Sequence, residues 1–334
     1  QQQPATGVRP TLAGNAERSL PGTRHQLITG NAVIRACPSI EFADLRRRPH
    51  AVCQIGHAGD YTHRPRTHRP CLPTPVSAPA PDSPELAQSI KDWGLALGFQ
   101  QVGITHTDLA TAEARLNAWL AAGLHGELDY MEKHGSKRSR PAELWPGTRR
   151  VISVRMDYLG TDIAAATHCL SDPERGYIAR YALGRDYHKT LRQRLQKLAD
   201  RITAEIRPHN YRVFTDSAPV MEKPLAEAAG LGWIGKHTNL INRSAGSCFL
   251  LGEIYTDLPL AVDTPASNHC GSCQACLDIC PTQAITAPYT LDARRCISYF
   301  TIETPGPIPT ELRAAMGNRI FGCDDCQLVC PWNK

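Results

Sequence analysis

Apolar residues recur at helical spacing from residue 83 onward. Ser83 can cap a helix that has Pro84 at its first position, and Gly98 supplies the stop. Between these signals one face carries Leu86, Ile90, Trp93 and Leu97. The pattern predicts an amphipathic helix that ends just before residue 98.

Strand and helix patterns then alternate along the chain. Strands are predicted at residues 101–105, 151–159 and 211–215. Helices are predicted at residues 109–122, 187–206 and 224–229. The segments TNLIN and CFLLGEIYT, on either side of RSAGS, predict a hairpin. Because strands and helices alternate, we expect an α/β domain over residues 82–262.

Residues 1–81 differ from the rest in composition. They contain no lysine, ten arginines against four acidic residues, and no sustained helical or strand period. Such a segment buries too little apolar surface to fold. We therefore expect an unstructured tail outside the working fold, in which Cys37, Cys53 and Cys71 are incidental.

The net charge of the chain is concentrated in that tail. The chain carries +5, and the tail has a surplus of six positive charges, so the remainder is near minus one. Net charge therefore gives no support for nucleic-acid binding by the folded part. No apolar run is long enough to span a membrane, and no apolar segment follows the arginines as an export signal requires. A cytoplasmic protein is expected.

Candidate chemistry is concentrated at the other end of the chain, where eight of the thirteen cysteines fall within the last 65 residues. CGSCQACLDICP follows the C-x2-C-x2-C-x3-C-P spacing of bacterial ferredoxins, in which the fourth cysteine ligates the other cluster. CDDCQLVCP repeats this spacing in part, and a cysteine between the two segments completes the second set. The spacing predicts two [4Fe-4S] clusters in a ferredoxin-like module over residues 263–334.

The crossover divides the eight cysteines into two sets. One cluster is assigned to Cys270, Cys273, Cys276 and Cys330, and the other to Cys280, Cys296, Cys323 and Cys326. Two four-cysteine zinc sites are the alternative, since zinc also takes C-x2-C pairs. Three cysteines spaced two residues apart and followed by C-P favour iron-sulfur clusters over zinc sites, whose cysteines come in pairs. Because clusters need a reducing compartment, a disulfide framework is not expected.

Three glycines, Gly230, Gly232 and Gly235, match GxGxxG, and Lys236 extends the match toward a phosphate-binding loop. The segment follows a helix and precedes a hairpin, whereas a dinucleotide site needs a strand before it and a helix after it. Neither nucleotide motif is accepted. The glycines either let backbone approach a large flat ligand closely or form a helix stop and a turn.

Asp216, at the end of a predicted strand, is the candidate general acid. A helix cap or an Asx turn is the alternative role. As an acid it would need its pKa raised by about three units, which an apolar, closed pocket can supply. Asp186 is expected to cap the long helix. His188 follows it as D-x-H, but Leu191 replaces the glycine of the cobalt-ligating motif, so a histidine on cobalt is not supported.

From about residue 84 to its end the chain resembles the epoxyqueuosine reductases, cobalamin-dependent enzymes that complete queuosine in tRNA. The resemblance rests on GELDYMEKHG, RPAELWPGTRRVISVRMDYL, RYALGRDYHKTLRQRLQKLA, TDSAPVMEKPLAEAAGLGWIGKHTNLI and the cysteines with RRCISY. It implies a nitroreductase-like α/β domain that holds cobalamin, followed by the two-cluster module. It also implies Asp216 as proton donor, and places near the cofactor His134, Lys236, Asn239 and Ser298.

The resemblance implies a reaction as well. A one-electron donor such as ferredoxin or flavodoxin reduces cobalamin through the two clusters, cobalt attacks the epoxide, and Asp216 protonates the oxygen. The substrate is tRNA carrying epoxyqueuosine, and a monomer with no membrane partner is expected. Family members normally continue into a helical-repeat segment that helps hold the RNA, which is not expected within this chain.

Two other functions stay open from the residues alone. One is a reductive dehalogenase-like enzyme, which would use the same cofactors. The absence of an export signal, and the TDSAP and GRDYH segments, argue against it. The other is a two-cluster electron carrier, in which the α/β part only docks a partner. Bound corrinoid after anaerobic purification would separate the enzymes from the carrier.

Overall fold

The computed structural model describes residues 35–36, 82–158 and 162–333. The described residues belong to one compact unit. Most of the expected tail lies outside the described residues. Its described part, β1 (Arg35–Ala36), pairs in parallel with β4 (Arg175–Ile178), and the tail outside the working fold stays a prediction.

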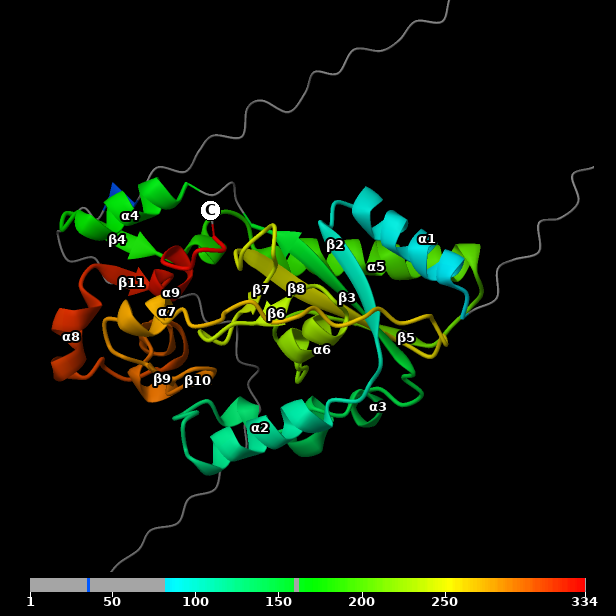
Figure 1. Cartoon of the computed structure of the whole chain (residues 1–334), viewed down its shortest axis with the longest axis horizontal. Coiled ribbons are helices and arrows are strands. Elements are labelled where there is room, and N and C mark those ends of the chain that lie inside the picture. Colours follow the sequence, from blue (N-terminus) through cyan, green and yellow to red (C-terminus); the bar gives the residue numbers. More distant parts are fainter. Residues whose placement is uncertain (1–34, 37–81, 159–161, 334) are drawn as a thin grey trace, which may run out of the picture. The chain divides into compact units, whose positions relative to one another are not determined.

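A four-stranded antiparallel sheet forms the centre of the α/β part (Figure 1). Its strands, in spatial order, are β2 (Gln101–Thr105), β3 (Arg150–Asp157), β8 (Phe249–Thr256) and β5 (Tyr211–Phe214). The register pairs β8 with β3 over eight residues and with β5 over four. The predicted strands are therefore confirmed, and their pairing places the end of β5 beside the middle of β8.

Helices cover both faces of this sheet (Figure 1). On one face α1 (Pro84–Ala96) and α5 (Tyr187–Glu205) bury the largest apolar cluster against Ile104, Ile152 and Ile254. Each such fully buried side chain contributes about 1.5–3 kcal/mol. On the other face, α6 (Glu222–Ala228) packs Leu225 and Ala226 against the sheet.

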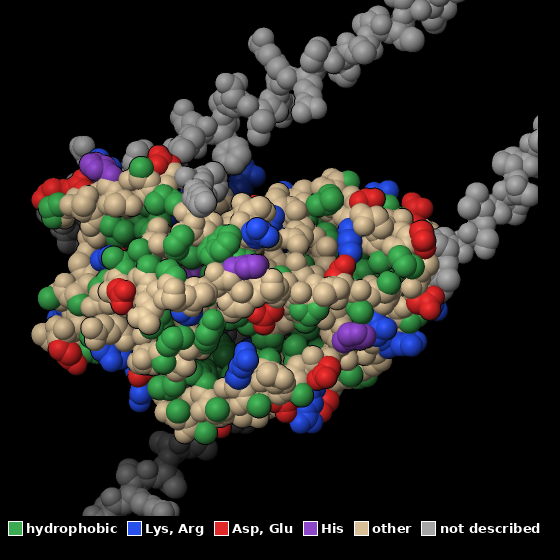
Figure 2. Space-filling view, viewed as in Figure 1, with side chains coloured by type: hydrophobic (Ala, Val, Ile, Leu, Met, Phe, Trp, Pro, Cys, Tyr) green, Lys and Arg blue, Asp and Glu red, His purple; other side chains and the backbone are tan. Residues whose placement is uncertain are grey.

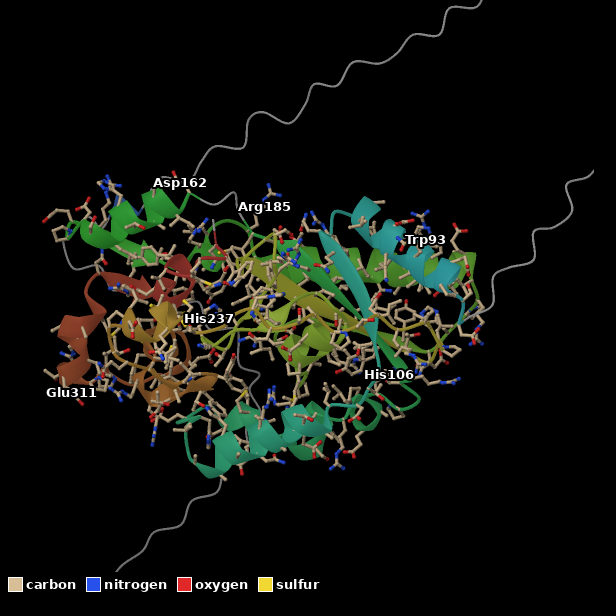
Figure 3. The ribbon with its side chains drawn as sticks, in the orientation of Figure 1. Trp93, His106, Asp162, Arg185, His237 and Glu311 are labelled. Carbon is tan, nitrogen blue, oxygen red and sulfur yellow. The ribbon has the colours of Figure 1, made fainter. Side chains whose placement is uncertain are left out.

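The helix signals in the sequence are confirmed by the caps. Ser83 Oγ accepts the N–H of Leu86 at 3.2 Å, and Asp186 Oδ1 accepts the N–H of His188 at 3.0 Å. The helix expected at residues 109–122 is α2 (Ala110–Ala121). Asp162 caps α4 (Ile163–Ser171), which the apolar pattern did not predict (Figure 3).

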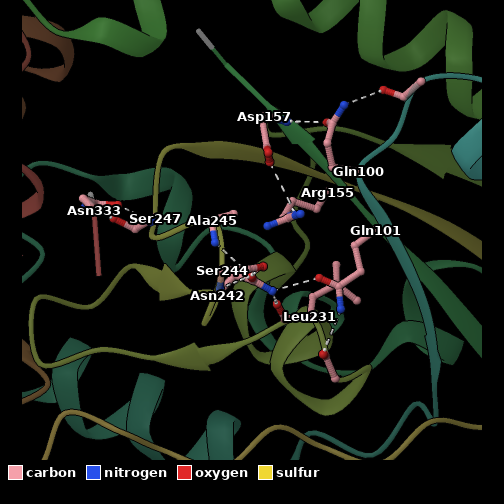
Figure 4. Close-up of polar contacts among 12 residues, drawn as sticks. Gln100, Gln101, Arg155, Asp157, Leu231, Asn242, Ser244, Ala245, Ser247 and Asn333 are labelled. Carbon is pink, nitrogen blue, oxygen red and sulfur yellow. Dashed lines mark hydrogen bonds and ion pairs between the residues drawn. The ribbon is translucent and has the colours of Figure 1, made fainter. Parts of the chain in front are cut away.

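The predicted hairpin is wrong. Its first segment, β7 (Leu240–Ile241), pairs with β6 (Trp233–Ile234), while β8 belongs to the central sheet. Asn242 causes the separation: its Oδ1 accepts the N–H groups of Ser244 and Ala245, and its Nδ2 donates to Leu231 O at 2.7 Å (Figure 4). The side chain thus turns the chain, and only the single bridge between Asn242 and Gly246 remains of the expected ladder.

The three glycines of the rejected nucleotide motif have structural roles. Gly230 follows α6 with a φ of +76°, as expected for a helix stop. A Cβ on Gly232 would lie 2.2 Å from Ile241 O, and one on Gly235 would lie 2.4 Å from the Ile241 side chain. These glycines therefore allow β6 and β7 to approach each other.

The cysteine-rich module consists of short elements. They are α7 (Ala275–Asp278), β9 (Ile285–Ala287), β10 (Thr290–Leu291), α8 (Thr310–Met316), β11 (Arg319–Phe321) and α9 (Asp325–Leu328). β11 pairs in parallel with β4, and Asn318 Nδ2 donates to the carbonyls of Cys169, Asp172 and Arg175. The module is therefore joined to residues 163–178, and the boundary at residue 262 stays a prediction.

A second connection runs through the segment after α2. Trp119 Nε1 donates to Leu291 O at 2.6 Å, and the N–H of Glu127 donates to Tyr299 Oη at 2.9 Å. The surface is hollowed between α2, α6 and the cysteine-rich module, and hydrophobic side chains border the hollow (Figure 2). Among the described residues, no helix is long and apolar enough to cross a membrane.

Candidate active site and cysteine centres

Asp216 lies just after β5 in a left-handed backbone conformation, with a φ of +36°. Its Oδ2 accepts the Tyr187 hydroxyl at 2.5 Å and lies 3.1 Å from His188 Nε2. The Asp216 N–H donates to Glu222 Oε1 at 2.7 Å. The carboxyl of Asp216 binds two side chains of α5 and does not cap α6, whose N-cap is Met221. The capping role expected as the alternative is therefore not the one seen.

The protein alone leaves Asp216 open. Its side chain is 55% exposed, so the apolar, closed pocket that the acid role requires is not formed by the described residues alone. A bound ligand would have to complete it.

Aromatic side chains stand around this carboxyl. Tyr181 contacts Tyr187 and Phe321, with ring centroids 6.2 Å and 6.4 Å apart. Burial and the Glu303 and Asp216 carboxylates raise the pKa of Tyr130 to about 12. Tyr130 and Phe321 are nevertheless 45% and 37% exposed. The site thus has uncovered aromatic surface, which suits a large flat ligand.

Two glutamates lie behind Asp216. Glu253, in β8, is fully buried, and Glu222 is the first residue of α6. Burial and the Asp216 carboxylate raise the pKa of Glu222 to about 7, and burial and Glu222 raise that of Glu253 further above its usual range. The pair therefore retains a proton near neutral pH.

Lys223 connects the carboxylates to the cysteines. Its ammonium donates to Asn239 Oδ1 at 3.0 Å. Burial lowers its pKa, while Glu222, the Cys326 and Cys296 thiolates and Asp216 act in the opposite direction. Lys223 therefore lies within electrostatic range of both Asp216 and the second cysteine set.

The first cysteine set is brought together. Burial and the neighbouring thiols of Cys330, Cys270 and Cys273 raise the pKa of Cys276 to about 11. The pKa of Cys330 is also raised, mainly by burial and then by the thiols of Cys270 and Cys273. Cys273 is exposed, whereas Cys276 and Cys330 are buried. This set thus reaches the surface at Cys273.

The cysteines of the second set are all half-buried. Burial raises the pKa of Cys326, and the thiols of Cys296, Cys280 and Cys276 raise it further. Burial raises the pKa of Cys323, and Asp325 and Cys326 raise it further. The Cys323 thiol donates to Asp325 Oδ2 at 2.7 Å. Cys276 of the first set is thus a neighbour of Cys326 in the second.

The nine described cysteines of residues 248–330 are free of disulfides, and Cys169 is disulfide-bonded. A single disulfide is not the disulfide framework against which the sequence argued. Among the described residues, no group of three or more His, Cys, Asp or Glu side chains is arranged to hold a metal ion.

The four residues expected beside the cofactor have different surroundings. Asn239 accepts a hydrogen bond from Lys223, as above, and Ser298 lies beside Cys296, where burial raises the pKa of the thiol and the Ser298 hydroxyl acts in the opposite direction. Lys236 is buried, and its ammonium donates to the carbonyls of Gly271 and Cys273 at 2.7 Å and 2.8 Å. His134 is exposed, and its side chain makes no hydrogen bond or ion pair among the described residues.

Lys236 therefore supports the loop of the first cysteine set. Its neighbour His237 lies between that module and α6 (Figure 3). Burial and the Lys223 charge lower the pKa of His237 to about 4, so its imidazole is neutral.

Several site residues were missed by the sequence reasoning. Tyr187 and His188 sit in the first turn of the predicted long helix, next to its cap. The sequence considered His188 only as a cobalt ligand and rejected it, and it gave no signal for Tyr187 beyond its position after Asp186. Tyr130, Tyr181 and Glu303 come from segments without a periodic pattern. Two further surface grooves, beside α2 and beside β5, do not include Asp216 among their lining residues.

Comparison with known sequences gives two family matches. Residues 138–217 match the family described as "Epoxyqueuosine reductase QueG, DUF1730", and residues 269–333 match the "4Fe-4S double cluster binding domain". The epoxyqueuosine reductase of Pseudomonas aeruginosa is 66% identical over 256 residues, covering 76% of this chain and 70% of the relative. That of Escherichia coli is 61% identical over 253 residues, covering 76% and 66%. The chain thus spans about two thirds of these relatives.

Solved structures agree with these matches. An epoxyqueuosine reductase with an epoxyqueuosine-modified tRNA-Tyr stem loop has a TM-score of 0.67 at 32% identity, covering 75% of this chain and 65% of that chain. The Bacillus subtilis enzyme, with its catalytic aspartate loop swung out of the active site, has a TM-score of 0.66 at 32% identity, covering 75% and 66%. The expected fold class, an α/β domain followed by a double-cluster module, is confirmed.

Proposed function

This chain belongs to the epoxyqueuosine reductase family, and we propose from that membership that it reduces epoxyqueuosine in tRNA to queuosine. The observation that carries the proposal is the Asp216 carboxyl, held by Tyr187 and His188 among uncovered aromatic rings, with Lys223 in electrostatic range of both Asp216 and the second cysteine set. A dehalogenase-like function is not favoured, because the relatives at 61–66% identity are epoxyqueuosine reductases.

The residues fit the cofactors that the family implies. Cys276 lies among the thiols of its set and Cys326 among those of the other, since neighbouring thiols add to burial in raising the pKa of each, and this suits two [4Fe-4S] clusters with the ligands divided as the spacing predicts. The aromatic surface of Tyr130, Tyr181 and Phe321 suits the flat corrin ring of cobalamin. When bound, cobalamin supplies a reduced cobalt nucleophile toward the epoxide carbon.

The two cysteine sets differ in their surroundings, which suggests the direction of electron flow. Cys273 of the first set is exposed, so a one-electron donor such as a ferredoxin or flavodoxin would dock there. Cys276 neighbours Cys326 of the second set, and Lys223 lies within electrostatic range of that set and of Asp216. Electrons would pass in that order, toward the aromatic site.

The proton comes from Asp216. Conversion of the epoxide to the alkene takes up two electrons and two protons and releases one water. Asp216 donates one proton to the epoxide oxygen as the ring opens. Tyr187 and His188 orient the carboxyl, since both lie on its Oδ2. Asn239 and Ser298 act indirectly in this scheme, through Lys223 and Cys296, and His134 is proposed only as a contact to a bound ligand.

The macromolecular partner is tRNA that carries epoxyqueuosine. Because its substrate is tRNA, the protein is proposed to act in the cytoplasm, as a monomer. The near-neutral charge of residues 82–334 implies few phosphate contacts by this part of the chain.

A complementation experiment tests the function. A strain lacking its own epoxyqueuosine reductase is complemented with this gene, and its tRNA nucleosides are analysed by mass spectrometry. Queuosine should replace epoxyqueuosine. Persistent epoxyqueuosine, with normal expression and bound corrinoid, would contradict the proposal, and protein without any corrinoid would indicate the two-cluster carrier.

A further inference from the structure

Lys236, in the turn between β6 and β7, is fixed to the cysteine-rich module by both its side chain and its backbone. Its ammonium donates to Gly271 O at 2.7 Å and to Cys273 O at 2.8 Å. Its own carbonyl accepts the N–H of Tyr289 at 3.0 Å. One of the two acceptors thus belongs to a cysteine that is assigned as a ligand of the first cluster.

The charge of Lys236 has no opposite charge beside it in the protein. The residue is only 9% exposed, and within the part of the chain that the structure describes its ammonium forms no ion pair with a carboxylate. Arg319, whose side chain is 13% exposed, instead donates to Asp325 Oδ2 at 2.6 Å. Because a buried charge is costly unless an opposite charge lies nearby, the surroundings of Lys236 call for an anion.

The first cysteine set supplies that anion when it holds its cluster. A [4Fe-4S] cluster with four thiolate ligands carries a net negative charge, and reduction adds one more. The carbonyls that Lys236 binds stand on the loop between the first two cysteines of this set. The ammonium is therefore held next to the cluster site by hydrogen bonds to the same loop that provides the ligands.

Apolar side chains keep water from one side of this set. Trp233 is 1% exposed and packs with Cys330, and Cys270 and Trp332 lie against the same hydrophobic group. The rings of the two tryptophans have centroids 5.1 Å apart. Since charges interact more strongly where water is excluded, the effect of a cation on this cluster is greater than on an exposed one.

We propose that the Lys236 ammonium is the counter-charge of the first cluster and raises its reduction potential. The cluster gains one electron and the external one-electron donor loses it, and no bond is formed or broken. A nearby positive charge stabilises the reduced cluster more than the oxidised one, and charge around a cluster is among the features that set its potential.

A raised potential suits the place of this set in the proposed electron path. Cys273 is exposed, so the first cluster is the one that meets the donor, and a higher potential makes its reduction by that donor more favourable. Lys236 is not a catalytic residue, because it acts through the cluster. The inference rests on the cluster assignment of the proposed function and not on the substrate.

A redox titration of the holoenzyme without substrate, followed by electron paramagnetic resonance of the reduced clusters, tests the proposal. Lys236→Met removes the charge but keeps much of the apolar stem. The midpoint potential of one cluster should fall, so that at a fixed potential its ratio of reduced to oxidised form drops about tenfold, or 59 mV for one electron. Lys236→Arg keeps the charge and should shift the potential far less.

Asn268→Ala is the matched control, because Asn268 Oδ1 accepts the Cys270 N–H at 2.9 Å on the same loop without carrying a charge. It should leave both midpoint potentials close to those of the wild type. Equal shifts in Lys236→Met and Asn268→Ala would show that loop geometry alone matters and would overturn the proposal. An unchanged potential in Lys236→Met with full iron content would overturn it too.

Loss of the cluster is covered by two further variants. Lys236→Gln keeps a donor for the loop carbonyls without the charge, and should lower the potential as Lys236→Met does. If both neutral variants retain only about four irons per chain, Lys236→Arg decides. Full iron in Lys236→Arg would support a counter-charge, and the same loss would overturn it. Zinc in place of iron in the wild type would instead contradict the cluster assignment itself.

Discussion

The cysteine-rich module and the Asp216 site differ in how their parts are distributed along the chain. Seven of the eight cysteines lie in two short segments with two or three residues between neighbours, and short helices present them. Asp216 meets Tyr187, which lies 29 residues away, and other neighbours of its carboxyl belong to different elements. The module depends on local chain geometry, whereas the acid site depends on how separate elements pack.

The two regions differ in solvent exposure as well. Cys276 and Cys330 are buried, while the Asp216 side chain is 55% exposed. The protein itself therefore encloses these two cysteines without a bound ligand. The acid site needs the cofactor and the substrate to close it.

The largest expected effect comes from a cysteine of the second set. Cys326→Ser should lower iron content from about eight to about four per chain, because one four-thiolate set is broken. Turnover should become undetectable, since electrons no longer reach the aromatic site. Iron analysis and turnover on anaerobically reconstituted protein measure both.

Cys248→Ser is the control for this change, because Cys248 is a buried free cysteine outside both sets. It should keep its full iron content. Full iron in Cys326→Ser, or the same loss in both variants, would contradict the ligand assignment and with it the local character of the module.

A smaller effect is expected for Tyr187→Phe, which removes one hydrogen bond to the Asp216 carboxyl. Single-turnover rate should fall about tenfold, or about 1.4 kcal/mol, near the low end for a hydrogen bond to a charged group because the site is open. Cofactor content should not change. Tyr211→Phe removes a comparable hydroxyl contact, to Asp200 at 3.1 Å, and should leave the rate unaltered. Equal rates in the two variants would show that packing alone orients Asp216.

The smallest expected effect is on stability as a function of pH. The folded pKa of Glu222, about 7, lies above its ordinary value of 4.5. Stabilisation by the retained proton is therefore fully present below about pH 4.5 and is lost as pH rises through about 7. Glu222→Gln cannot lose this proton, so its Tm should fall less over that range than the wild-type Tm.

Each kcal/mol changes Tm by about 2–4 °C in a domain of this size, so thermal unfolding of both proteins from pH 4 to 8 measures the effect. Parallel Tm profiles would mean that Glu222 does not retain its proton up to about pH 7.

The sequence predicted the regular elements well where one physical signal dominated. The strands at residues 101–105 and 211–215 and the cap at Ser83 agree with the structure, because periodicity and capping are local. The hairpin failed, because Asn242 hydrogen-bonds with Leu231 and with the turn that follows it. A strand-propensity pattern gives no information about such side-chain hydrogen bonds.

For the site, the residue type was predictable but its surroundings were not. Asp216 was found from its place after a strand. Glu222, six residues later, has no pattern of its own, and its pairing with Glu253 exists only because β5 lies beside β8 and α6 packs across that face. Lys236 was expected beside the cofactor, yet its ammonium holds the loop of Cys273. Contacts of this kind follow from tertiary packing.

The central claim, that Asp216 donates the proton to the epoxide oxygen, is tested most directly by Asp216→Asn. The variant keeps the size of the side chain and an acceptor for Tyr187, but it has no acidic proton. Single-turnover conversion of epoxyqueuosine is measured in protein whose iron and corrinoid contents equal those of the wild type. The account predicts a loss of about a hundredfold or more, the usual contribution of a positioned acid. Conversion at a rate near that of the wild type would contradict it.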